Sequence, residues 1–427
     1  MKKLSFLAAA AVLALTVQSV SGAITIDTSS ATDWKISNGV LSLDWNSTNG
    51  NVSGVHLAGY PDNLVDLTHS PRGLYMDNSG TFGSGARTAD YYQDASYIDW
   101  WVTTASSSSN AFTYSQHFIL ADGDSGFHVY FVVNHASTDI DGSLGQIQYV
   151  FRISQTLFTN TYSADTGLNN LGPKLIPLPA PSVVGTTDPG RQVQDATVDL
   201  HGLQIPDGFG REFYTKYDYS TYEYLHRAHG LYGSTYGAWA VIPRTDSFVG
   251  GPTKQDLTFT FNILMIEALS DHLNNGASYS YPSGTDGTRL FGPYYFHFNT
   301  FGGNINTPDD MYADAVNAIS SVDTLYDNDP VLLQNGYAPT TGRGTLSASV
   351  SGGEPWNPLS AWAVLSDDQK NFQYSGIGNQ YWANAQSGQE MQLGDVVPGT
   401  YHFSAYVLGQ WGELRRNGIS VAGNQNT

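Results

Sequence analysis

The stretch FTYSQHFILADGDSGFHVYFVV, residues 112–133, decides the fold class. Residues 112–119 alternate apolar and polar side chains, and residues 126–133 begin with the same alternation before they become continuously apolar. This period of two is typical of β-strands with one buried face. The segment between them, 121–126, is rich in Asp and Gly and predicts a hairpin turn. We therefore expect two antiparallel neighbours in a sheet.

Segments with the same alternation occur elsewhere in the chain, at 39–45, 344–350 and 401–407. The chain has 45 glycines and only 13% charged residues, a composition that favours a turn-rich protein over a helical one. We predict an all-β protein. Its large β-sandwich should occupy residues 23–330, and a smaller sandwich, fibronectin-III-like or immunoglobulin-like, should occupy residues 336–427.

One helix interrupts this pattern and should close the first domain. Thr307 can cap its N-terminus, and Pro308 suits the first helical position. The apolar side chains of the expected helix fall on one face at helical spacing: Met311, Ala315, Val316, Ile319 and Val322.

The N-terminus carries the pattern of a secretory signal peptide. Lys2 and Lys3 precede an apolar run at 4–17, and small residues follow it. We expect residues 1–22 to be removed by cleavage before Ala23. The apolar run is too short to span a bilayer, so we expect a secreted, extracellular protein without a membrane partner.

Composition excludes several function classes. The sequence has no cysteine, which rules out thiolate catalysis and cysteine-based zinc sites. Its formal charge of -20 argues against nucleic acid as a partner, because phosphate binding needs clustered cations. Neither a helical histidine pair nor a calcium-binding loop of the EF-hand type is present, so we expect no metal and no cofactor.

The most unusual stretch is 214–233, which holds six tyrosines, two histidines, one lysine and one arginine. Aromatic faces beside basic groups suit a site that grips an acidic sugar polymer. The alternative is a pair of strands with half-buried tyrosines, because Tyr217 and Tyr219 alternate as strand residues do.

Five blocks of sequence resemble one known family. In order they are SGF at 125–127, KYDYS to RAHG at 216–230, GGPTKQ to SDH at 250–272, FGP at 291–293, and VPGTY to GQWGE at 397–413. Together they resemble the rhamnogalacturonan lyases of polysaccharide lyase family 4. The resemblance implies a large β-sandwich of the galactose-mutarotase type followed by a fibronectin-III-like sandwich.

The resemblance also implies a reaction. These enzymes cleave the rhamnose–galacturonate bond of rhamnogalacturonan I by β-elimination. The family's catalytic lysine falls on Lys216, the expected base, and its catalytic histidine falls on His272, the expected acid. The reverse assignment is chemically sound as well. A lysine acts as a base only if its pKa is depressed, which burial and a cation such as Arg227 could achieve.

Basic and aromatic residues are the expected substrate contacts: Arg152, Tyr214, Tyr217, Arg227, His229 and Lys254. The chain also departs from the family pattern. An arginine that usually neutralises the galacturonate carboxylate is replaced by Gln148, and two tyrosines found in some members fall near Met265 and Glu267.

Three hypotheses follow from these observations. The first is a secreted, monomeric rhamnogalacturonan endolyase that acts on a polysaccharide. The second is a non-catalytic glycan-binding protein on a lyase scaffold, motivated by Gln148 and Glu267. The third is a mutarotase-like sugar epimerase, because fold alone does not separate these functions.

Overall fold

The computed structural model covers the chain from Ala23 to Thr427 with gaps. It describes residues 23–77, 85–163, 174–177, 192–194, 197–199, 213–215, 217–219, 221–252, 254–257, 259–260, 262–270, 278–349, 361–367, 371–374, 376–385, 390–407 and 411–427.

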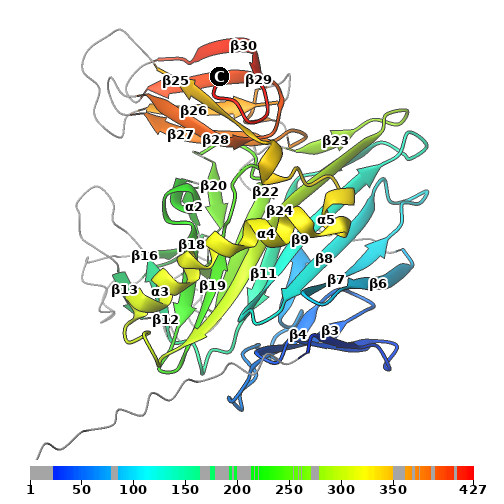
Figure 1. Cartoon of the computed structure of the whole chain (residues 1–427), viewed down its shortest axis with the longest axis vertical. Coiled ribbons are helices and arrows are strands. Elements are labelled where there is room, and N and C mark those ends of the chain that lie inside the picture. The colour runs from blue at the N-terminus through cyan, green and yellow to red at the C-terminus, as the bar shows by residue number, and fades with distance from the viewer. Residues whose placement is uncertain are drawn as a thin grey trace, which may run out of the picture.

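Two antiparallel sheets form the large sandwich in this part of the chain (Figure 1). The first sheet contains, in spatial order, β1 (Thr25–Asp27), β2 (Asp33–Ser37), β3 (Leu41–Asn46), β4 (Val52–Leu57), β5 (Leu74–Asp77), β11 (Gln146–Arg152), β22 (Ile263–Ser270) and β21 (Phe259–Thr260). The second contains β13 (Lys174–Pro177), β12 (Asn160–Ser163), β18 (Ala228–Tyr232), β19 (Tyr236–Val241), β24 (Gly287–Thr300), β9 (Gly126–His135), β8 (Thr113–Ala121), β7 (Tyr97–Thr104) and β6 (Arg87–Gln93).

The predicted hairpin is confirmed at the centre of the second sheet, where β8 pairs antiparallel with β9. The end of β9 is continuously apolar because both of its faces are buried. One face packs against the first sheet, and helices cover the other, where Tyr130 and Val132 belong to one apolar cluster with Val322 and Leu332.

Aromatic side chains fill the space between the two sheets. Phe151 on β11 meets Phe296 on β24 with ring centroids 5.2 Å apart, and Phe127 on β9 packs 5.7 Å from Phe296. All three are fully buried. Truncating such a ring to alanine typically costs about 3–5 kcal/mol of stability, so this core holds the sheets together.

Three helices run across the outer face of the second sheet (Figure 1): α3 (Pro308–Asn317), α4 (Ile319–Asn328) and α5 (Pro330–Gln334). The predicted helix start is confirmed, since Thr307 accepts a 3.1 Å hydrogen bond from the backbone N–H of Asp310. The expected single helix divides at Ala318. Met311 and Val322 are nevertheless buried on the predicted face, against the sheet.

A smaller pair of sheets follows toward the C-terminus. One consists of β25 (Gly344–Ala348) and β28 (Met391–Val396), and the other of β27 (Gln380–Ala385), β26 (Ala361–Ser366), β29 (Gly399–Val407) and β30 (Leu414–Val421). Leu365, Leu393 and Ala405 belong to a separate apolar core between them. The structure thus confirms an all-β protein with a large sandwich followed by a small one.

Short elements complete the described structure: β10 (Gly142–Leu144) with β23 (Tyr279–Tyr281), β14 (Gln192–Gln194) with β15 (Thr197–Asp199) and β16 (Phe213–Thr215), β17 (Tyr217–Tyr219) with β20 (Gln255–Leu257), helix α2 (Thr221–His226), and the 3-10 helix η2 (Thr340–Gly342). Within the described residues, no helix has the length and apolar character needed to cross a membrane.

Candidate functional site

Both residues of the predicted catalytic pair, Lys216 and His272, lie outside the described residues. The elements beside them are described. Strand β17 begins at Tyr217, directly after Lys216, and β22 ends at Ser270, two residues before His272. These two strands therefore indicate where the candidate site lies.

The β17–β20 ribbon packs on the first sheet, on the face that points away from the sandwich core. Tyr217 pairs with Leu257 across the ribbon. Both side chains join an apolar cluster with Val150 of β11 and Met265 of β22. The residue that follows Lys216 and the strand that leads to His272 thus meet on one face of one sheet.

This outward face follows from the strand period of two. On β11, Tyr149 and Phe151 enter the core, so Gln148 and Val150 point the other way. The side chains that alternate outward from β5, β11 and β22 define the face: Tyr75, Asp77, Gln148, Val150, Arg152, Ile263, Met265 and Glu267.

Two carboxylates flank Gln148 on this face. Gln148 pairs with Asp77 on one neighbouring strand and with Glu267 on the other. Its side-chain Nε2 donates a 3.0 Å hydrogen bond to Oδ2 of Asp77. Glu267 is only 1% exposed. The position where the family usually carries an arginine therefore holds a neutral amide between two acids. The row formed by Asp77, Gln148 and Glu267 contains no cation that could neutralise a bound uronate.

Two predicted cations lie beside the row. Arg152 is four residues from Gln148 along β11, roughly 13 Å away. It donates a 3.3 Å hydrogen bond from Nη2 to the hydroxyl of Tyr75. Lys254 reaches β22, where its Nζ donates a 3.0 Å hydrogen bond to the backbone carbonyl of Glu267. The structure thus brings Arg152, Tyr217 and Lys254 to the elements that border one surface.

The remaining predicted contacts lie elsewhere. His229 sits on β18 of the second sheet and is fully buried, which leaves it no exposed surface for a polymer. The backbone of Tyr214 belongs to β16. Arg227 occupies the corner between α2 and β18, where its Nη2 donates a 2.5 Å hydrogen bond to the carbonyl of Pro243. The predicted binding wall is therefore divided between separate places.

Sequence reasoning missed Tyr75 and Asp77 as parts of this surface. Asp77 is 71 residues away from Gln148, its hydrogen-bond partner. The only local signal is the alternation of Leu74 and Met76 with these two polar residues, which indicates a strand but not its neighbour.

Comparison with known proteins gives the relationship. Residues 356–427 match the family described as "Polysaccharide lyase family 4, domain II", and residues 171–254 match "Probable rhamnogalacturonate lyase B middle domain". Rhamnogalacturonate lyase B of Emericella nidulans is 27% identical over 88% of this chain and 53% of its own length. Probable rhamnogalacturonate lyase C of the same organism is 30% identical over 95% of this chain and 39% of its own length.

The chain is a relative of the rhamnogalacturonate lyases of polysaccharide lyase family 4. The resemblance found in the sequence is thereby confirmed. The chain spans about half the length of the rhamnogalacturonate lyases B that it matches. The middle-domain match covers the positions of Lys216, Tyr217, Arg227, His229 and Lys254.

Among solved structures, a putative aldose 1-epimerase from Escherichia coli K12 aligns with 65% of this chain and 100% of its own, at 10% identity and a TM-score of 0.31. The match to domain II of polysaccharide lyase family 4, residues 356–427, covers all strands of the small sandwich except β25.

Proposed function

We propose that this chain is a secreted rhamnogalacturonan endolyase that cleaves rhamnose–galacturonate bonds by β-elimination. The observation that carries the proposal is the meeting of β17 and β22 on the outward face, in a chain related to rhamnogalacturonate lyases along most of its length. This meeting supports a pair of catalytic residues, one beside each strand, that act on the same sugar.

The proposed chemistry needs a base, an acid and a cation. The base, Lys216, removes the proton on C5 of galacturonate, which is acidic because C5 is next to the carboxylate. The electron pair forms the C4–C5 double bond while the bond from C4 to the glycosidic oxygen breaks. His272 then protonates the departing oxygen of rhamnose. The product carries an unsaturated uronate at its new non-reducing end.

The substrate carboxylate needs a partner during this step, because negative charge builds up beside it. Gln148 is neutral and its row is acidic. Arg152 and Lys254 are the cations that border the outward face within the described residues. We assign the carboxylate to these two side chains.

A second candidate function follows from the same row. A lyase scaffold with Gln148 between Asp77 and Glu267 could bind a glycan without cleaving it, since the usual carboxylate clamp is replaced. Binding of rhamnogalacturonan I with no unsaturated product would support this alternative. Conversion between the anomers of galactose would support the epimerase hypothesis.

The test uses rhamnogalacturonan I and homogalacturonan as substrates. Ultraviolet absorbance of the unsaturated uronate should rise only with rhamnogalacturonan I. Early products should be long oligosaccharides, as expected for internal cleavage. N-terminal sequencing of the exported protein should begin at Ala23.

The variant Lys216→Ala tests the base assignment. It should lower kcat roughly 10²–10⁴-fold with an unchanged circular dichroism spectrum, because general base catalysis contributes about that much. Lys35→Ala is the matched control, since Lys35 is 67% exposed on β2 and far from β17 in sequence. Wild-type turnover in Lys216→Ala would show that another group is the base.

A further inference from the structure

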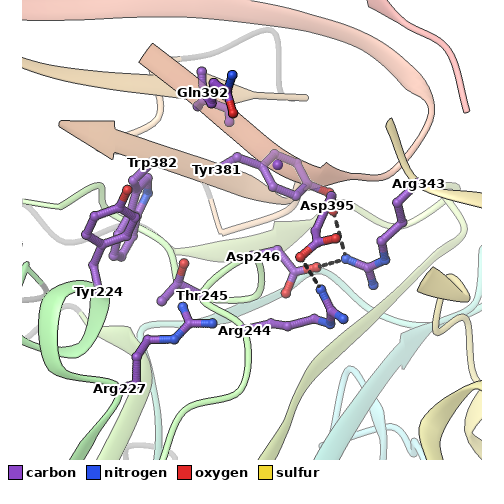
Figure 2. A pocket seen from close by; sticks show the side chains of 12 residues that line it. Tyr224, Arg227, Arg244, Thr245, Asp246, Arg343, Tyr381, Trp382, Gln392 and Asp395 are labelled. Carbon is purple, nitrogen blue, oxygen red and sulfur yellow. Dashed lines mark hydrogen bonds and ion pairs between the residues drawn. The ribbon is translucent and has the colours of Figure 1, made fainter. Parts of the chain in front are cut away.

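A cavity of about 170 Å³ lies between the large and the small sandwich (Figure 2). Its charged wall consists of three arginines and two aspartates, and an indole ring adds an apolar surface: Arg227, Arg244, Arg343, Asp246, Asp395 and Trp382. These residues come from the corner between α2 and β18, from the loop after β19 and from the small sandwich with the segment that leads into it. The cavity is separate from the outward face.

Two of the three arginines have carboxylate partners, as the dashed lines of Figure 2 show. Nη1 of Arg343 lies 2.8 Å from Oδ2 of Asp246, and Nη1 of Arg244 lies 2.9 Å from Oδ2 of Asp395. Each pair joins one sandwich to the other. These ion pairs account for both aspartates of the wall, and their role is to dock the two sandwiches.

Arg227 has a different environment. No carboxylate of the described residues lies within ion-pair distance of it, and its one recorded hydrogen bond goes to the carbonyl of Pro243. Figure 2 shows its side chain reaching from the α2–β18 corner toward Thr245. Burial, followed by the like charge of Arg244, lowers its pKa. The wall therefore holds one guanidinium with no carboxylate of the described residues in direct contact, although Asp395 and Asp246 act on it from farther away.

The backbone at Arg227 is strained. Its φ of 64° lies in the left-handed region, which is unfavourable for a residue with a side chain. Strain of this kind persists where the surrounding structure enforces it, often at binding sites. Here it gives the chain the sharp corner that turns the guanidinium away from β18 and toward the cavity.

Further donors in the wall lack acceptors. Trp382 is 3% exposed, and its indole Nε1 has no hydrogen-bond partner within the described structure. The same is true of Nε of Arg244. Buried donors are normally satisfied, so each one that is not calls for an explanation such as a bound ligand. Within the described structure, the wall thus combines a guanidinium that has no carboxylate in direct contact with unsatisfied N–H groups.

We propose that this cavity binds a hexuronate, either as a free sugar or as the uronate end of a short oligosaccharide. Arg227 would hold the carboxylate, because a guanidinium makes paired charge-assisted hydrogen bonds to this group. Trp382 would pack against the ring, with its N–H directed at a ring substituent. The volume is similar to that of an engineered cavity, about 150 Å³, which holds a single benzene ring.

Occupation would couple the sandwiches. A ligand held between Arg227 of the large sandwich and Trp382 of the small one contacts both, so it stabilises their docking and raises Tm. The site does not require the chain to be a lyase, because none of its residues takes part in the proposed elimination.

Calorimetric titration of the full mature chain with D-galacturonate, and with D-galactose as the neutral analogue, tests the proposal. Galacturonate should bind at least about tenfold more tightly than galactose, since a hydrogen bond to a charged group is worth about that factor. A trigalacturonide that also binds would assign the site to an oligosaccharide end, and one that does not would restrict it to the free sugar. Equal affinity for galactose and galacturonate would overturn the proposal.

Variants locate the binding site. Arg227→Gln should weaken galacturonate about tenfold or more, while Arg416→Gln, a matched change on the exposed face of β30, should leave the affinity unchanged. Trp382→Phe keeps an aromatic six-membered ring but removes the N–H together with the rest of the indole, and it should weaken binding about threefold or more. It decides the question if Arg227→Gln fails to fold. Wild-type affinity in whichever of these variants folds would overturn the proposal.

Lys216→Ala separates the two proposed sites. Galacturonate should bind this variant with unchanged affinity, whether or not the wild-type protein cleaves rhamnogalacturonan I. A loss of binding would place the sugar on the outward face and refute the cavity as its site. Cleavage of the polymer by the wild-type protein, together with no binding of galacturonate to the cavity, would leave the proposed function intact.

Discussion

The outward face of the first sheet and the cavity between the sandwiches both collect charged side chains, but they balance them differently. On the outward face, Asp77 and Glu267 flank the neutral amide of Gln148. In the cavity, both aspartates of the wall pair with guanidinium groups, and Arg227 has no carboxylate in direct contact among the described residues. The face on which we propose the elimination takes place is therefore the more acidic of the two.

A basic residue in a tyrosine-rich stretch therefore need not belong to the site that the stretch suggests. Arg227 is eleven positions after Lys216, yet its side chain lines the interface with the small sandwich. Within the described residues, the cations that border the outward face are Arg152 on β11 and Lys254. The Nζ of Lys254 donates a hydrogen bond to the backbone of Glu267 on β22.

The largest effect should come from breaking the buried pair that docks the sandwiches. Arg343→Gln leaves Asp246 without its guanidinium partner in a site where the side chains are 3% and 13% exposed. Removing one partner of a buried pair typically costs about 3–5 kcal/mol, which urea unfolding should detect.

Arg415→Gln is the matched control for that change. Arg415 pairs with Glu413 at 2.8 Å, but the side chains are 40% and 23% exposed, so its loss should cost at most about 1 kcal/mol. Equal losses in the two variants would mean that burial does not distinguish the two ion pairs.

A third buried cluster gives a further contrast, because there two carboxyl groups, Asp99 and Asp329, lie close together. The histidine beside Asp99, His117, has a pKa that burial lowers to about 3. Burial, followed by the nearby carboxyl of Asp99, raises the pKa of Asp329 to about 7. Since this folded-state pKa lies above the unfolded one, near 3.8, the protonated acid stabilises the fold below about pH 4. The contribution is lost as the pH rises through 7.

Asp329→Asn should therefore remove most of this pH dependence. Asparagine can keep the cap that Oδ1 of Asp329 provides for the backbone N–H groups of Val331 and Leu332, and it carries no charge. At pH 8 the variant should be more stable than the wild type by on the order of 2 kcal/mol, and the difference should vanish near pH 4. Asp90→Asn, at an exposed position of β6, is the control. Parallel pH profiles for wild type and Asp329→Asn would contradict the assignment.

The smallest effect should come from reducing the charge of the outward face. Asp77→Asn keeps an oxygen that can accept from Nε2 of Gln148 but removes one negative charge. KM for rhamnogalacturonan I should fall about fivefold at low salt, which corresponds to about 1 kcal/mol of relieved repulsion. The gain should disappear at high salt, because ions screen it.

Asp44→Asn, on β3 of the same sheet, provides the control because Asp44 pairs with the exposed Lys35 away from β11. An unchanged KM in Asp77→Asn would show that the substrate carboxylate does not approach the acidic row.

Patterns within short segments were sufficient for much of the fold. The alternation in 112–133 predicted the β8–β9 hairpin, and Thr307 with Pro308 predicted the start of α3. These predictions succeed because strand period, turn chemistry and capping depend on residues a few positions apart.

The neighbours of the candidate site had to come from tertiary structure. Gln148 was recognised as a departure from the family, but its position between Asp77 and Glu267 depends on which strands pair and in which register. Likewise, the pairing of Asp246 with Arg343, 97 residues apart, places the second sandwich against the first and encloses Arg227. Which side chains carry charge can be read from the residues alone, but which charges meet depends on how distant strands pack.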